Sequence, residues 1–157
     1  MIGLIACCKT KLDRAAPVRE LYTSPLFRLS LAYAEARCSA VYVASAQHDL
    51  LELDRVLGPY NRTMASLTPM QRKLFGAAVA RGLVDRHGDA FDLLILAGSA
   101  YIDPIRLALA KMGRGPGVVV GGGDGHGRVQ IVEPLAGMQI GERLSFLSRA
   151  TARAEAA

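Results

Sequence analysis

The chain has 157 residues, of which 51% are hydrophobic and 21% are charged, a balance that excludes a disordered segment and is typical of a globular domain. No apolar run reaches the roughly 18 residues of a membrane-spanning helix, and the start MIGLIACC lacks the basic leader and cleavage site of a secretion signal. We expect one domain over residues 1–157, a cytoplasmic location and no membrane partner. The net charge of +5 is a small excess that agrees with a nucleotide or nucleic-acid partner.

Continuous apolar runs mark the predicted strands. IGLIA, AVYVA and DLLILA do not alternate with polar residues, which indicates strands that are covered on both faces, as in a parallel sheet. The predicted strands are Ile2–Ala6, Ala40–Ser45, Asp92–Ala97 and Gly117–Val120. The first of them should lie in the centre of the sheet.

A capping residue followed by proline marks three predicted helix starts, at Ser24-Pro25, Thr68-Pro69 and Asp103-Pro104. The predicted helices are Pro25–Arg37, Pro69–Arg86, Pro104–Lys111 and Gly141–Ala154. Strands that alternate with helices predict an α/β fold of three layers, with a mostly parallel central sheet and helices on both faces.

The glycine-rich segment GPGVVVGGGDGHGRVQIVEP predicts a C-terminal hairpin at the edge of the sheet, because two β-rich runs flank an Asp-Gly turn. A phosphate-binding loop is disfavoured, since the segment lacks the Lys-Ser/Thr pair of that motif.

Polar residues follow three of the predicted strands, in CCKTK, SAQHDLL and GSAYIDP. Ligands of open α/β sheets bind outside the carboxyl ends of the strands, so this arrangement predicts a ligand site there. The loop LGPYNRT adds a tyrosine and an arginine. The ligand-binding candidates are Cys8, Lys9, Thr10, Lys11, Ser45, Gln47, Tyr60, Arg62, Ser99 and Tyr101.

Each candidate has an alternative interpretation. Lys9 and Lys11 either hold a phosphate or carboxylate or are solvated turn residues. Tyr60 either stacks on a base or covers the edge of the core. Asp103 is explained by helix capping alone.

His48 and Asp49 are the catalytic candidates, as an acid–base residue with a nearby carboxylate. Neighbouring residues usually point apart, so the two are not expected to form a dyad with each other. We expect no metal, because Cys8 and His48 lack the further ligands of a metal site, and no other cofactor. The three cysteines do not form a disulfide framework.

Six segments resemble the DUF6884 family, a bacterial and phage domain of unknown function. In order along nearly the whole chain they are CCKTK, ELYTSPLF, VASAQHDLL, LGPYNRTM, LAGSAY and PLAGMQIGERLSFL. In outline this family is similar to the YaaA family of peroxide-stress proteins. The resemblance implies an α/β domain with polar strand ends, linked by analogy to DNA or nucleotide metabolism. Lys9 and Lys11 match the family's first motif, whereas Asp49 stands where glycine is common.

Two functions from different classes compete. The first is an enzyme that acts on a nucleotide or nucleic-acid base, with cleavage or transfer at an N-glycosidic bond as the favoured reaction. The second is a non-catalytic DNA-binding or oxidative-stress protein with a basic face. That face would comprise Arg14, Arg19, Arg62, Arg72, Lys73 and Arg81. A small-ligand sensor without catalysis is a third hypothesis, and the sequence predicts no oligomeric state.

Overall fold

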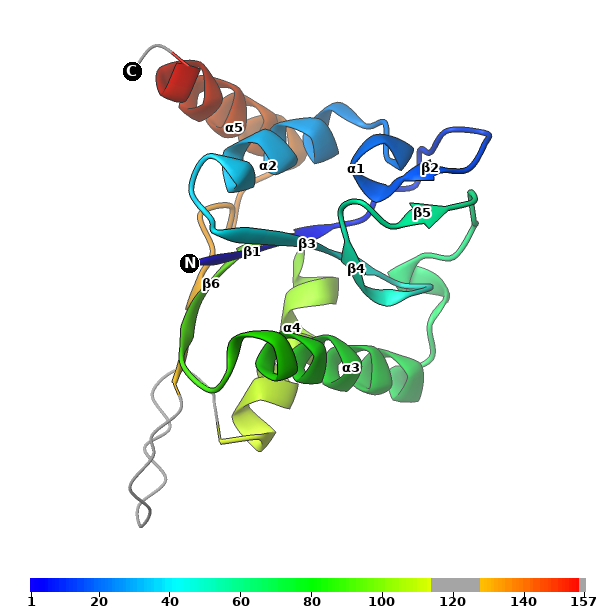
Figure 1. Ribbon diagram of the computed structural model, residues 1–157, viewed down its shortest axis with the longest axis vertical. Coiled ribbons are helices and arrows are strands. Elements are labelled where there is room, and N and C mark those ends of the chain that lie inside the picture. Colours follow the sequence, from blue (N-terminus) through cyan, green and yellow to red (C-terminus); the bar gives the residue numbers. More distant parts are fainter. Residues whose placement is uncertain (114–127, 156–157) are drawn as a thin grey trace.

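Five strands form the central sheet of the computed structural model, which describes residues 1–113 and 128–155 (Figure 1). Their order across the sheet is β4-β3-β1-β6-β7, and every pair is parallel except β3 with β4. The strands are β1 (Ile2–Ala6), β3 (Ala40–Ser45), β4 (Asp49–Glu52), β6 (Phe91–Leu96) and β7 (Val129–Val132). The predicted central position of β1 is confirmed, since Ile5 pairs with Val43 on one side and with Leu96 on the other.

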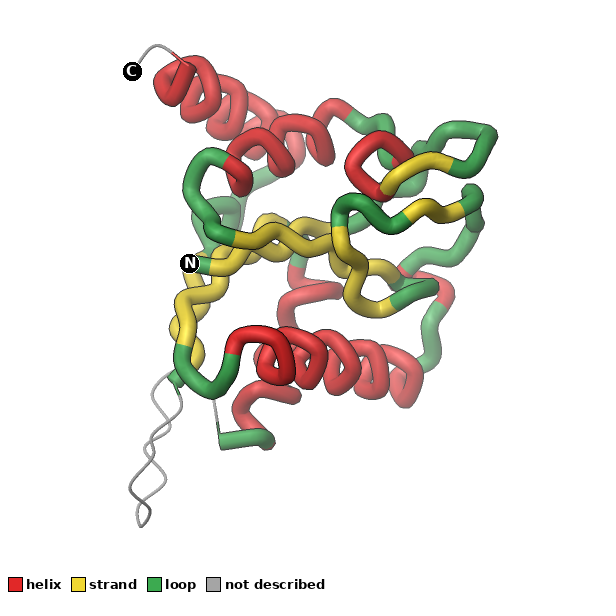
Figure 2. Tube along the Cα trace, in the orientation of Figure 1, coloured by secondary structure: helices red, strands yellow, loops and turns green. Residues whose placement is uncertain are grey.

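The helices lie in two layers, one on each face of the sheet (Figures 1 and 2). One layer contains α1 (Val18–Leu21), α2 (Pro25–Glu35) and α5 (Ile140–Glu155), and the other contains α3 (Pro69–His87) and α4 (Ser99–Lys111). A short 3-10 helix, η1 (Met64–Ser66), precedes α3. The predicted three-layer α/β fold is therefore confirmed.

Each face of the sheet has its own core. Leu4, Leu93 and Ile95 point toward α3 and α4, where Val79 and Ile105 are buried. On the other face Ile5, Val43 and Leu94 pack with buried residues of α2 and α5, among them Phe27 and Leu147. This alternation explains the continuous apolar runs, because both sets of side chains along each strand are buried. No helix in the described part of the chain is long and apolar enough to cross a membrane.

Two of the three predicted helix starts are correct. Ser24 Oγ accepts a hydrogen bond from the Phe27 amide at 3.1 Å, and Thr68 and Gln71 cap α3 reciprocally. The third start is wrong, because α4 begins at Ser99 and Pro104 lies inside the helix. The chain becomes helical immediately after β6, so Asp103 is not an N-cap and instead pairs with Arg106 at 3.6 Å.

Several short elements were not predicted. A second sheet joins β2 (Ala16–Pro17) to β5 (Val56–Leu57) in antiparallel pairing, and β4 follows β3 after a tight turn. Such short strands carry too little periodicity to be recognised in a sequence. The predicted edge hairpin begins outside the described residues, where Gly117–Val120 falls. Its second half contains β7, which is the edge strand next to β6.

Gly76 allows α3 and α4 to approach closely. A methyl group at this position would overlap the backbone carbonyl of Pro104, which has no freedom to move away as a side chain would. We predict that Gly76→Ala lowers the free energy of unfolding by about 1–3 kcal/mol in spite of alanine's better helix propensity. Urea denaturation measures the change. The control is Gly141→Ala in α5, where no atom lies within 4 Å of the added methyl; equal stability of the two variants would contradict the prediction.

Candidate functional site

The strand order places a topological switch point between β1 and β6. The chain leaves β1 for β3 on one side of it and later returns to β6 on the other side. Loops diverge at such a point and open a crevice at the carboxyl ends of the strands. Cys7 follows β1 there, and its sulfur lies 3.3 Å from the hydroxyl of Tyr101 in the first turn of α4. The two loops beside the switch point are thus joined by a thiol–phenol contact.

Tyr60 is the centre of a hydroxyl cluster beside this contact. Its Oη lies 2.7 Å from Ser45 Oγ, at the end of β3, and 2.5 Å from Tyr22 Oη, just before α2. Ser45 is fully buried, and its oxygen accepts the amide N–H groups of Gln47 and His48. Because these two bonds occupy the acceptor sites of Ser45 Oγ, its own proton must be donated to Tyr60.

The tyrosines of the cluster remain neutral phenols. Burial raises the pKa of Tyr22, and the hydrogen bond to Tyr60 raises it further. Burial likewise raises the pKa values of Tyr60 and Tyr101, and the neighbouring Cys7 adds to both shifts. At neutral pH the three hydroxyls therefore donate and accept hydrogen bonds without carrying charge.

Lys11 holds the loop after β1 against the tyrosines. Its ammonium donates to the carbonyl oxygens of Cys8 at 2.9 Å and Lys9 at 3.3 Å. It also lies 4.2 Å from the ring centroid of Tyr60 and 5.5 Å from that of Tyr22, within the range of cation–π attraction. Lys11 thus has a structural role in the site and places a positive charge beside the two rings.

His48 lies in the turn between β3 and β4, with its ring edge against Tyr60. The two ring centroids are 5.0 Å apart and the rings are nearly perpendicular. Burial lowers the pKa of His48, Arg55 lowers it further, and Asp49 opposes the shift. The imidazole is therefore neutral at neutral pH and has a nitrogen available to accept a proton.

Residues 2–118, which include this entire cluster, match the model of a family of unknown function, DUF6884. The chain belongs to the DUF6884 family. Searches of curated proteins and of solved structures found no significant match. The similarity to YaaA proteins therefore stays a prediction.

Asp49 follows His48 at the end of the tight turn after β3 and is the first residue of β4. Its φ of 58° lies in the left-handed region, which glycine adopts without strain and aspartate tolerates better than most residues. A glycine at this position would adopt the turn without strain. Burial raises the pKa of Asp49, while Arg62 and His48 oppose the shift.

We predict that Asp49→Asn stabilises the protein at neutral pH. A raised pKa in the folded state means that the ionised carboxylate is disfavoured there, so it costs stability once the pH exceeds the pKa of the unfolded chain. Asparagine tolerates the left-handed backbone and removes the charge. Melting temperatures measured against pH should show a gain that shrinks as the pH falls toward about 4. Asp13→Asn, at an exposed site, serves as control. A variant less stable than the wild type at neutral pH would show that Arg62 outweighs burial.

The structure brings only some of the predicted site residues together. Lys11, Ser45, His48 and Tyr60 contact one another around the cluster, and Tyr101 reaches it through Cys7. The other candidates lie at the margin of the cluster. Three of them are exposed, namely Lys9, Thr10 and Gln47, and Cys8 Sγ donates a hydrogen bond to the Thr10 carbonyl at 3.1 Å. Arg62 is close enough to oppose the rise in the pKa of Asp49. Ser99 lies apart from the cluster, in a cavity of about 340 Å³ with Arg143 and Glu133.

Sequence reasoning missed two members of the site. Neither Tyr22 nor Cys7 is among the site residues that the sequence predicts. Tyr22 lies two residues before Ser24, the N-cap of α2, and that position in the sequence is the only signal for it. Backbone hydrogen bonds from Leu12 to Leu21 and from Thr23 to Thr10 hold the two segments together.

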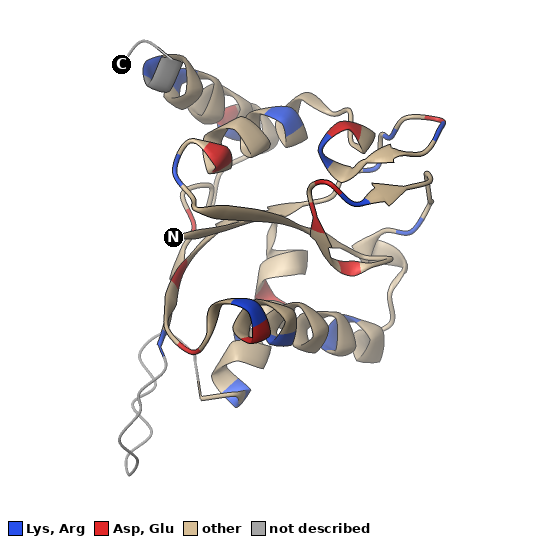
Figure 3. Cartoon of the chain, in the orientation of Figure 1, with Lys and Arg blue, Asp and Glu red and all other residues tan. Residues whose placement is uncertain are grey.

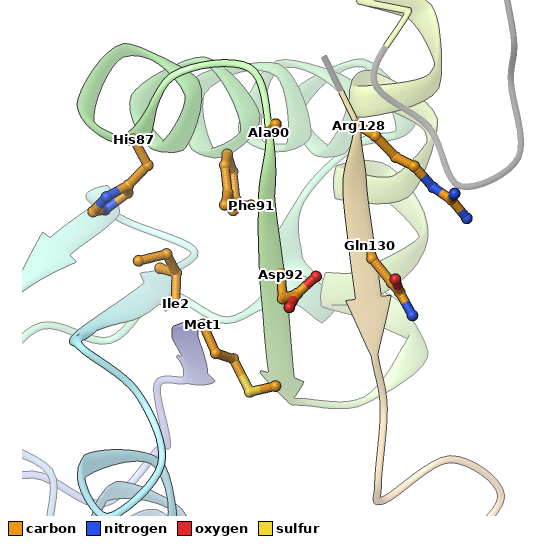
Figure 4. Close-up of a pocket in the computed structure, with 8 residues that line it drawn as sticks. All are labelled: Met1, Ile2, His87, Ala90, Phe91, Asp92, Arg128 and Gln130. Carbon is orange, nitrogen blue, oxygen red and sulfur yellow. The ribbon is translucent and has the colours of Figure 1, made fainter. Parts of the chain in front are cut away.

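A cavity of about 560 Å³ lies at the opposite edge of the sheet, at the amino ends of the strands (Figure 4). Its polar side chains do not converge. Asp92, Arg128 and Gln130 project to one side of β6 and β7, whereas His87 lies on the other side and bonds to Tyr42 Oη at 3.0 Å. We therefore favour the cluster around Tyr60 over this cavity as the candidate catalytic site.

Proposed function

We propose that this DUF6884 protein is an enzyme that acts on a nucleotide or nucleic-acid base at the carboxyl edge of its sheet. The hydroxyl cluster around Tyr60 carries the proposal. A turn that served only to connect β3 to β4 would not need a serine, three tyrosines, a thiol and a lysine joined across five segments. Polar groups that gather at a switch point are the arrangement by which α/β proteins bind small ligands.

The cluster has the groups that a base and a sugar-phosphate require. The aromatic rings of Tyr60 and His48 offer surfaces against which a base packs, and neutral phenols donate hydrogen bonds to its ring nitrogens and oxygens. Lys11 adds a fixed positive charge, and Lys9 is exposed at the rim, where a phosphate would lie.

The favoured reaction is cleavage or transfer at an N-glycosidic bond. In hydrolysis, neutral His48 takes a proton from water as the water oxygen bonds to the anomeric carbon. The carbon–nitrogen bond breaks, and its electron pair leaves with the base. The base takes a proton from solvent, and His48 releases to solvent the proton that it took from water, so that one water is consumed in all. The positive charge that develops on the sugar is stabilised by the Asp49 carboxylate, which lies next to His48. In transfer, another nucleophile replaces the water.

A screen for released base tests the proposal. The purified protein is incubated with a panel of nucleosides, nucleotides and modified DNA, and mass spectrometry detects free base. We expect at least one substrate to yield base with the wild type, and little with His48→Ala. If no member of the panel is cleaved or transformed, the enzymatic proposal fails.

Non-catalytic nucleic-acid binding is the second candidate, favoured by the Lys and Arg residues along α3 (Figure 3). The predicted basic face has less free positive charge than the sequence indicates, however, because carboxylates neutralise one of its members. Arg19 pairs with Glu35 at 3.1 Å and with Asp54 at 2.9 Å. A binding constant whose logarithm falls linearly with the logarithm of salt concentration would support this function. A slope near zero would exclude it.

A further inference from the structure

An apolar groove runs along the outer surface of α3 and α4, away from the tyrosine cluster. It has a volume of about 310 Å³, and Leu74, Ala77, Leu107 and Ala108 line it. Leu74 is 63% exposed and Leu107 is 47% exposed, and Met70, one helical turn before Leu74, is 63% exposed. Large side chains so exposed on two adjacent helices form a surface that a binding partner would cover.

Cations without carboxylate partners border this groove. Lys73, Arg81 and Lys111 line it together with the leucines, and no acidic residue does. None of the three forms an ion pair with a carboxylate in the described part of the chain. Arg106, which lies on α4 with Lys111, contrasts with them, since it pairs with both Asp103 and Glu133. The groove is therefore apolar at its floor and positively charged at its rim.

A second cavity of about 280 Å³ extends the groove toward the start of α4 and shares Lys73, Pro104 and Leu107 with it. Asp103 also lines this end, where its carboxylate pairs with Arg106 at 3.6 Å. Arg72 lines this end, and its Nε is buried without a hydrogen-bond acceptor among the described residues. No side chain caps α4, whose first amide groups lie at the same end. An unpaired guanidinium N–H beside an uncapped helix N-terminus favours an anionic group, which would satisfy both.

We propose that the α3–α4 groove, defined by these two cavities, binds an acidic amphipathic helix of a partner protein. The apolar face of such a helix would cover Leu74 and Leu107. One of its carboxylates would reach Arg72 and the start of α4, and others would face Arg81 and Lys111. Along α3 the groove extends from Arg72 to Arg81, about 14 Å, so between two and three turns of the partner helix fill it.

Two other occupants fit the surface less well. A second copy of the chain placed groove to groove would bring the same cations together. DNA would leave Met70, Leu74 and Leu107 against its phosphates, and tyrosine or tryptophan stacking surfaces are not among the residues that line the groove.

Selection from a phage-displayed library of helical peptides tests the proposal. The wild-type protein is the target, and peptides that also bind Leu74→Glu/Leu107→Glu are removed first. We expect the recovered peptides to have apolar residues three and four positions apart and an excess of Asp and Glu. Failure to recover groove-dependent peptides, or recovery of basic ones, would overturn the proposal.

Charge reversal provides the quantitative test. A recovered peptide, labelled with fluorescein, is titrated against each variant and followed by anisotropy. Lys73→Glu/Arg81→Glu should weaken its binding by about tenfold or more. Arg72→Gln should weaken it too, whereas Ile140→Glu, an equally exposed apolar site on α5 at 64%, should not. Melting temperatures establish that each variant is folded. If Leu74→Glu/Leu107→Glu does not fold, Leu74→Ala is used in its place.

Two further outcomes would also overturn the proposal. One is a short DNA duplex that binds the wild type and loses affinity with Leu74→Ala. The other is a dimer, seen by light scattering, that the same substitution dissociates.

Discussion

His48→Ala is expected to lower turnover by about 100-fold to 10,000-fold, the usual cost of losing a general base. The imidazole is half-buried against Tyr60, and its pKa is lowered by burial and by Arg55, so that the proton-accepting form prevails at neutral pH. No hydrogen bond from the ring to another described residue holds the turn, since the contact with Ser45 is made by the backbone amide. The variant should therefore keep its fold and still bind the ligand through Tyr60, with a loss of affinity much smaller than the loss of turnover.

Steady-state kinetics with a substrate found in the base-release screen measure this effect. Asn61→Ala is the control, because Asn61 is an exposed polar residue next to Tyr60 in the sequence and is not among the ligand-binding candidates. An ordinary histidine has a pKa of about 6.5 and loses its proton-accepting form below that pH. Because the pKa of His48 is lower, the rate of the wild type should begin to fall only at a lower pH. If His48→Ala retains activity within a few-fold of the wild type, His48 is not the base.

Tyr60→Phe is expected to lower the free energy of unfolding by about 1–3 kcal/mol, the cost of leaving buried polar groups without a partner. The phenol oxygen accepts the proton of Ser45 and lies 2.5 Å from Tyr22 Oη, and both of these partners are fully buried. Phenylalanine fills nearly the same space, so little of the cost comes from packing. Affinity for the ligand should fall as well, because the relative positions of the loops after β1 and β3 depend on this oxygen.

Tyr33→Phe is the control for the loss of a hydroxyl. Tyr33 is buried between α2 and α5, and its hydroxyl takes part in no hydrogen bond with another described residue. Chemical denaturation should place Tyr33→Phe close to the wild type and Tyr60→Phe well below it. Equal stability of the two variants would mean that the hydroxyl cluster does not hold the site together.

The layers of the fold were predictable because burial on both faces leaves a direct trace in the sequence. The runs IGLIA, AVYVA and DLLILA have no polar alternation, and all three are strands of the parallel core. The start of α4 was not predictable in the same way. The Asp103-Pro104 pair is a strong helix-start signal, but the chain is already helical at Ser99, where glycine rather than a polar side chain precedes it.

The candidate site was predictable in its location and less so in its members. Strand-end residues such as Ser45 and His48 follow from the rule that ligands bind at the carboxyl edge of the sheet. Tyr22 and Tyr60 are far from one another in the sequence and come from loops, so their contact depends on how those loops fold. The involvement of Cys7 was hidden as well, since a cysteine after a buried strand is usually only a small apolar residue.

The most direct test of a ligand site at the carboxyl edge is a crystal structure of the protein soaked in a mixture of nucleoside monophosphates. The account predicts a base packed against Tyr60 and His48, with its phosphate toward Lys9. A nucleotide bound only in the α3–α4 groove or at the amino ends of the strands would contradict it. Crystals that stay empty while the same nucleotides also fail to raise the melting temperature in solution would contradict it equally.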